Sequence, residues 1–131
     1  MIQSAAEFIT LRTSENPADY HRSAREPAPL EVWNEVITKF PEFKFWVVIN
    51  KTVPLSILLQ LSKDPDPQIR SAVADKRKIP FEIQMALAND MDESVRARLI
   101  FNKKTDQRVL ELLKNDKSEF VRAQYNSQVV A

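Results

Sequence analysis

The sequence contains neither cysteine nor glycine. Without cysteine the chain forms no disulfide bonds and has no thiolate nucleophile, and it cannot hold zinc or an iron–sulfur cluster through thiolates. Without glycine it lacks the loop by which Walker and Rossmann motifs surround phosphate groups. These two absences exclude thiol chemistry and both of those routes of nucleotide binding.

An excess of charge of one sign and a long apolar run are also missing. The formal net charge is +1, from 19 basic and 18 acidic residues, so no overall field draws the chain to nucleic acids or membranes. No apolar run approaches the ~18 residues of a membrane span. Residues 1–12 do not resemble a signal peptide, because Gln3, Ser4 and Glu7 interrupt them. We expect a soluble, cytoplasmic protein that does not bind membranes.

What the sequence does contain is a pattern that recurs every 26 residues. The positions that share a residue type across three copies are Lys51, Arg77 and Lys103; Leu61, Leu87 and Leu113; Asp64, Asp90 and Asp116; Ile69, Val95 and Val121; and Arg70, Arg96 and Arg122. A fixed period of this length is typical of stacked units that are individually too small to bury an apolar face.

Within each period the apolar residues have helical spacing, which predicts two short helices joined by alternating acidic and basic turns. The expected helices cover residues 4–12, 17–24, 30–40, 55–63, 67–75, 81–89, 93–101, 106–114 and 118–126, and a further helix starts at Pro41. The length of 131 residues is that of one domain. Within it we expect capping helices in 1–28, about four repeats in 29–126 and a tail in 127–131.

The repeated segments resemble the leucine-rich repeat variant and HEAT-like helical repeats. Residues 58–70, 84–96 and 110–122 share paired short helices, a turn aspartate and an arginine six residues later. The resemblance implies an all-α fold, a right-handed HEAT-like solenoid of stacked short helix pairs with period 26 and an N-terminal two-helix cap. Some family members carry an N-terminal iron–sulfur cluster, which this chain cannot hold by thiolates. The chain is also similar to small bacterial helical-repeat proteins, some of which act as antitoxin-like immunity proteins.

The turn aspartates and the arginines that follow them form a second regular feature. The pairs are Asp64 with Arg70, Asp90 with Arg96, and Asp116 with Arg122. An arginine at this distance is able to bond in a bidentate way to the aspartate of its own or a neighbouring unit. Two interpretations follow, a structural ladder that sets the stacking register or a row of arginines that binds a substrate. Exposed pairs would contribute only about 0–1 kcal/mol each.

The turns predict two charged edges. Basic turns contain Lys51 and Thr52, then Lys76, Arg77 and Lys78, then Lys103 and Lys104. Acidic turns contain Asp64 and Asp66, then Asp90, Asp92 and Glu93, then Asp116 and Glu119. These charges complement helix dipoles, each by about 0.3–1 kcal/mol, or one edge docks a partner of opposite charge.

Large side chains at outward positions are candidates for a partner-binding surface. The column of Trp46 continues as Ala72, Arg98 and Gln124, which indicates an outward position, and Phe45 heads a column of small residues. Trp33 and Phe43, in contrast, occupy core columns. The candidate residues are Phe45, Trp46, Arg98 and Phe120. In the alternative interpretation, the helices of residues 4–24 fold over the two neighbouring aromatics.

Catalytic chemistry has little support in the sequence. His21 is the one histidine and stands beside Asp19 and Arg22, so we expect a surface residue and no general base. We predict a non-enzymatic protein without cofactor or metal, monomeric, that binds another protein as an inhibitor or immunity-type protein. The alternative is nucleic-acid binding, in which a phosphate backbone follows Lys51, Arg77 and Lys103.

Overall fold

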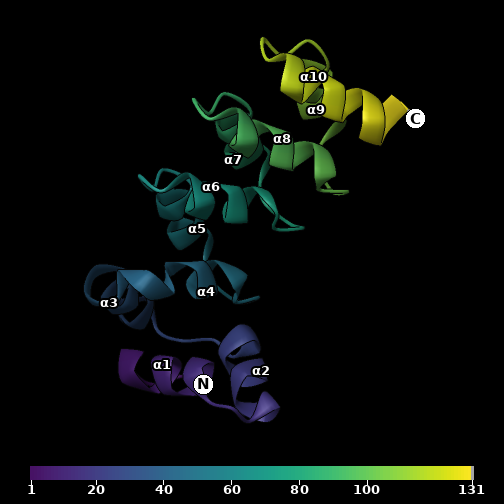
Figure 1. Ribbon diagram of the computed structural model, residues 1–131. Coiled ribbons are helices and arrows are strands. Elements are labelled where there is room, and N and C mark those ends of the chain that lie inside the picture. The colour runs from purple at the N-terminus through teal and green to yellow at the C-terminus, as the bar shows by residue number, and fades with distance from the viewer. Residues whose placement is uncertain (131) are drawn as a thin grey trace. The chain divides into compact units, whose positions relative to one another are not determined.

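The computed structural model describes residues 1–130, and this part of the chain is all-helical, without a β-strand (Figure 1). The α-helices are α1 (Ala5–Thr13), α2 (Pro17–Arg25), α3 (Leu30–Lys39), α4 (Lys44–Ile49), α5 (Leu55–Leu61), α6 (Pro67–Ala74), α7 (Phe81–Ala88), α8 (Glu93–Phe101), α9 (Gln107–Lys114) and α10 (Glu119–Tyr125). A 3₁₀ turn, η1 (Pro41–Phe43), precedes α4, and a π-helical turn, η2 (Asn126–Val130), follows α10. The predicted all-α class is confirmed.

The chain forms two compact units, the first comprising Met1–Gln60 and the second beginning at Leu61. No helix among residues 1–130 combines the length and the apolar character needed to cross a bilayer. The helix expected from Pro41 onward begins as η1 and becomes α-helical only at Lys44. Of the expected tail, Ala131 lies outside the described residues, and the residues before it belong to η2.

Polar side chains cap the N-termini of several helices. The side chains of Asn16, Asp66, Asp92 and Asp106 each accept a hydrogen bond from the backbone N–H two residues later, where α2, α6, α8 and α9 begin. Such caps satisfy N–H groups that have no partner within the helix. Throughout residues 1–130 no residue has a positive φ angle, so no turn requires glycine.

The core of the first unit forms where α1 packs against α2 and α3, and α4 packs against α2 and α3. Phe8 of α1 and Trp33 of α3 are both 0% exposed. Their rings meet edge to face, with centroids 5.2 Å apart and an interplanar angle of 81°. Phe43, expected in the core with Trp33, lies in η1 and is partly exposed.

In the second unit α8 packs between α6 and α10, and α7 packs against α8 and α9. Leu61, Leu87 and Leu113 are each 1% exposed. A fully buried leucine contributes about 1.5–3 kcal/mol, and helices this short depend on such packing because they are marginal in isolation.

Two asparagines at the ends of helices join neighbouring segments. Asn102 donates from Nδ2 to the carbonyls of Ala74 and Lys76 at 2.8 and 2.7 Å, and its Oδ1 accepts from the N–H of Lys104 at 3.0 Å. In the first unit Asn50 makes the same set of bonds, to two carbonyls near the end of α2 and to an N–H two residues later. Both side chains are buried, and each satisfies backbone groups that are at least partly removed from water.

Candidate functional site

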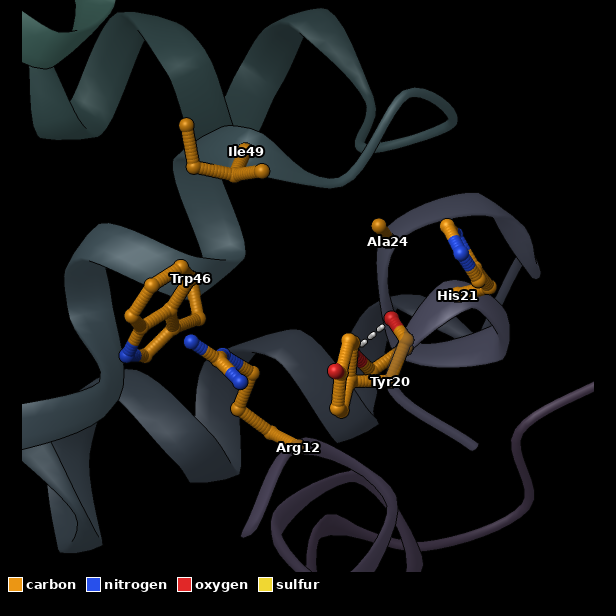
Figure 2. Close-up of a pocket in the computed structure, with 7 residues that line it drawn as sticks. Arg12, Tyr20, His21, Ala24, Trp46 and Ile49 are labelled. Atoms are coloured by element: carbon orange, nitrogen blue, oxygen red, sulfur yellow. Dashed lines mark hydrogen bonds between the residues drawn. The ribbon is translucent and has the colours of Figure 1, made fainter. Parts of the chain in front are cut away.

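An open cleft in the first unit is lined by side chains of α1, α2 and α4 (Figure 2). Its volume is about 460 Å³, and ligand pockets commonly have ~300–1,000 Å³. Figure 2 shows Arg12 between the rings of Trp46 and Tyr20. We call this site the Trp46 cleft, and its lining residues are Arg12, Tyr20, His21, Ser23, Ala24, Trp46 and Ile49.

Arg12 lies in the last turn of α1 and stacks on aromatic rings. The guanidinium carbon is 3.3 Å from the ring centroid of Trp46 and 5.7 Å from that of Tyr20. A cation over an aromatic face is attracted by the ring quadrupole. The Nε atom of Arg12 is buried and has no hydrogen-bond partner. The Nε–H group therefore lacks the hydrogen bond that it would make in water.

The structure agrees in part with each sequence interpretation of Trp46, the outward position and the covered one. It is half-buried, because Arg12 of α1 covers one part of its ring. Phe45 beside it is 39% exposed and contacts the Trp46 ring edge to face, with centroids 4.9 Å apart. Ile49, one helical turn further along α4, is 40% exposed. The helix α4 thus presents two exposed apolar side chains at the cleft, Ile49 in its lining and Phe45 beside Trp46.

In the second unit the turn aspartates and arginines form a connected ladder. Arg70 donates to both carboxylate oxygens of Asp90, at 2.8 and 3.1 Å, and to the backbone oxygen of Asp64 at 2.8 Å. Arg96 repeats this with Asp116, at 2.9 and 3.1 Å, and with the backbone of Asp90 at 2.7 Å. Each arginine bonds the carboxylate one period ahead and the backbone of its own turn.

The ladder pairs are mostly removed from water. The side chains of Arg96 and Asp116 are 5% and 7% exposed. Burial by itself raises the pKa of Asp116, but hydrogen bonds from Arg96 and from the N–H of Ser118 outweigh it, so the pKa lies below the ordinary 3.8. Arg122 donates to the backbone oxygen of Asp116 at 2.7 Å and is otherwise exposed. The occupied donors of Arg70 and Arg96 favour the structural interpretation over substrate binding.

Arg98 and Phe120, the other partner-binding candidates, lie on the second unit. Arg98 pairs with Asp75 at 2.8 Å, where both side chains are 45% exposed, and its guanidinium carbon is 5.5 Å from the ring centroid of Phe101. Phe120 of α10 is 45% exposed. Neither residue lines the Trp46 cleft.

The basic turns of the second unit lie together. Asn102 links the turn after α8 to the backbone of Lys76 in the turn after α6. Arg77 and Lys103 are exposed in these turns, whereas Lys76 is partly buried and burial lowers its pKa. Lys51 is exposed after α4 in the first unit.

Groups suited to metal binding do not gather in the described chain. Among residues 1–130 no three histidine, aspartate or glutamate side chains are close enough together to hold a metal ion. His21 is exposed and lines the Trp46 cleft, where it has a tilted ring contact with Tyr20. The chain matches no protein-family model, no curated protein and no solved structure with which it was compared.

Nothing in the sequence points to Arg12, because it lies outside the repeated columns that make neighbouring units comparable. Asn50 and Asn102 do leave a signal, since they are two periods apart and each precedes a lysine. Lys76 occupies the intervening position and conceals that signal.

Proposed function

We propose that this chain is a non-enzymatic helical-repeat protein that binds another protein, as an inhibitor or immunity-type protein that masks its partner. The observation that carries the proposal is the Trp46 cleft beside the exposed Phe45 and Ile49. Aromatic and arginine side chains dominate the energy of protein interfaces when a partner covers them. Here the two residue types stand in one cleft next to an apolar surface.

The architecture we propose for this binding protein is a right-handed HEAT-like solenoid with an N-terminal two-helix cap, of the leucine-rich repeat variant type. The support comes from bonds that recur within the units. Asn102 in the second unit and Asn50 in the first bond backbone groups in the same way. Arg70 and Arg96 likewise make equivalent bonds one period apart. Stacked repeats are expected to make the same bonds at equivalent positions, because each repeat contacts its neighbours in the same way.

Trp46→Ala is expected to weaken capture of the protein partner at least ~10-fold, because loss of a central aromatic commonly costs 2 kcal/mol or more. The measurement is affinity capture from native extract with tagged wild type and variant, followed by titration of the captured protein. Leu30→Ala is the matched control, since Leu30 is an exposed apolar residue of the same unit outside the cleft. Equal recovery of every partner by wild type and Trp46→Ala removes the cleft from the interface.

Nucleic-acid binding is the second candidate, favoured by the linked basic turns around Arg77 and Lys103. Duplex binding through these turns is expected to weaken by ~0.9 log unit per log unit of salt for each phosphate neutralised. Titration of labelled DNA and RNA at two salt concentrations measures this slope. Arg77→Gln with Lys103→Gln should flatten it, and the absence of binding at low salt ends this candidate.

A further inference from the structure

Arg12 is a charged group in the wall of the Trp46 cleft that has no carboxylate partner. The other arginines that are at least partly buried, Arg70 and Arg96, each pair with an aspartate. Arg12 makes no ion pair within the described residues, and its Nε–H has no acceptor. The guanidinium group instead contacts the rings of Trp46 and Tyr20.

The stacking decides which part of the guanidinium is left for a ligand. Trp46 covers a face of the planar group, and the N–H donors lie in that plane, at its edge. Donors arranged as a fork match the two oxygens of a carboxylate, or of a phosphate. The lining of the cleft includes neither aspartate nor glutamate, so no carboxylate of the wall competes for these donors.

The surroundings favour a carboxylate over a phosphate or a nucleotide. One guanidinium neutralises the single charge of a carboxylate but leaves one charge of a dianionic phosphate uncompensated. The Trp46 face that would hold a nucleobase is already covered by Arg12. Ile49 and Ala24 add apolar wall on the side away from the charge. A carboxylate next to an apolar group therefore fits both the charged and the apolar part of the cleft.

We propose that the Trp46 cleft binds a carboxylate of a partner peptide, with Arg12 as the counter-ion and Ile49 against the apolar residue beside that carboxylate. This inference rests on the proposed protein binding and adds the chemistry of the partner segment. The carboxylate belongs to an aspartate or glutamate side chain or to a free C-terminus.

The test titrates isotope-labelled wild-type chain with short peptides and follows two resonances, the indole N–H of Trp46 and the Nε–H of Arg12. The probes are acetyl-Leu-Asp-Leu-amide, its asparagine counterpart, acetyl-Leu-Leu with a free C-terminus, and inorganic phosphate. We expect at least one carboxylate peptide to bind ~10-fold or more tightly than the asparagine peptide, since an ionised partner strengthens the hydrogen bonds. The aspartate and free-terminus peptides distinguish the two sources. The indole N–H of Trp33, which is buried, is the internal reference.

Arg12→Gln should abolish the preference for carboxylate, whereas Arg25→Gln should keep it. Arg25 is exposed on α2 outside the cleft, so the control changes the net charge equally. Equal affinity of wild type for the aspartate and asparagine peptides overturns the inference, and so does a response to phosphate alone. If those peptides bind equally while Trp46→Ala still loses the captured protein, protein binding stands and the carboxylate assignment falls. If the carboxylate peptide binds while capture is unaffected by Trp46→Ala, the carboxylate assignment stands and the cleft lies outside the interface with the captured protein.

Discussion

Asp116→Ala is expected to lower the free energy of unfolding by about 3–5 kcal/mol, because it leaves the buried guanidinium of Arg96 without its counter-charge. Arg96 is 4% exposed and gives two of its hydrogen bonds to Asp116. The bond to the backbone of Asp90 remains in the variant, but it carries no negative charge. Urea titration followed by circular dichroism gives the free energy of unfolding.

The matched control is Asp75→Ala, which breaks an arginine–aspartate pair of the same unit at the surface. Asp75 and Arg98 are each 45% exposed, so water replaces the lost partner. Exposed pairs contribute about 0–1 kcal/mol, and the control should lose no more than that. Similar losses in the two variants would mean that Asp116 does not neutralise a buried charge.

The same pair predicts how stability depends on pH. Because the folded protein holds the pKa of Asp116 below its ordinary value, folding favours the charged carboxylate. Its contribution is complete above about pH 5, where an unfolded aspartate is almost fully ionised, and is lost as the pH falls through the lower pKa of the folded state. The advantage of wild type over Asp116→Asn should therefore shrink in urea titrations from about pH 6 to about pH 2. A constant difference over that range contradicts the prediction.

Trp33→Ala should destabilise the first unit by about 3–5 kcal/mol, the usual cost of truncating a buried aromatic. The indole is fully buried and meets Phe8 edge to face. Its Nε1–H has no hydrogen-bond partner, so Trp33→Phe should lose less, since it keeps an aromatic contact and removes an unsatisfied donor.

The measurement for Trp33 is the same urea titration, with hydrogen exchange of backbone amides in α1 and α3 as the local readout. Leu30→Ala is the control, because Leu30 belongs to α3 but is 48% exposed. A loss below about 1 kcal/mol for Trp33→Ala would show that the ring does not fill the core of the first unit.

The repeated columns made the helices and the buried leucines predictable. Apolar spacing locates a helix because packing demands it, and Leu61, Leu87 and Leu113 are indeed buried. The ladder was predictable as a set of residues but not as a set of bonds. Whether Arg70 bonds to the carboxylate of Asp64 or of Asp90 depends on how closely successive helix pairs approach each other. A local sequence pattern does not encode that distance.

The sequence repeat does not predict the contacts of the Trp46 cleft. The column of Trp46 predicts an outward position, and the half-buried ring departs from this because Arg12 covers it. Arg12 and Tyr20 come from helices that precede the repeat, so no column compares them with other copies. Contacts between unlike segments depend on tertiary packing alone.

The glycine-free turns bear on how such a chain can lengthen or shorten. Since every described residue keeps a negative φ angle, each junction between helices accepts ordinary L-amino acids without strain. Gene recombination that duplicates or deletes one helix pair would then join ends that need no special backbone conformation. The new junction needs a residue that can begin the next helix, either an acceptor side chain such as Asp66 or Asp92 or a proline such as Pro80. Duplication or loss of a helix pair should therefore depend little on which residues connect the helices.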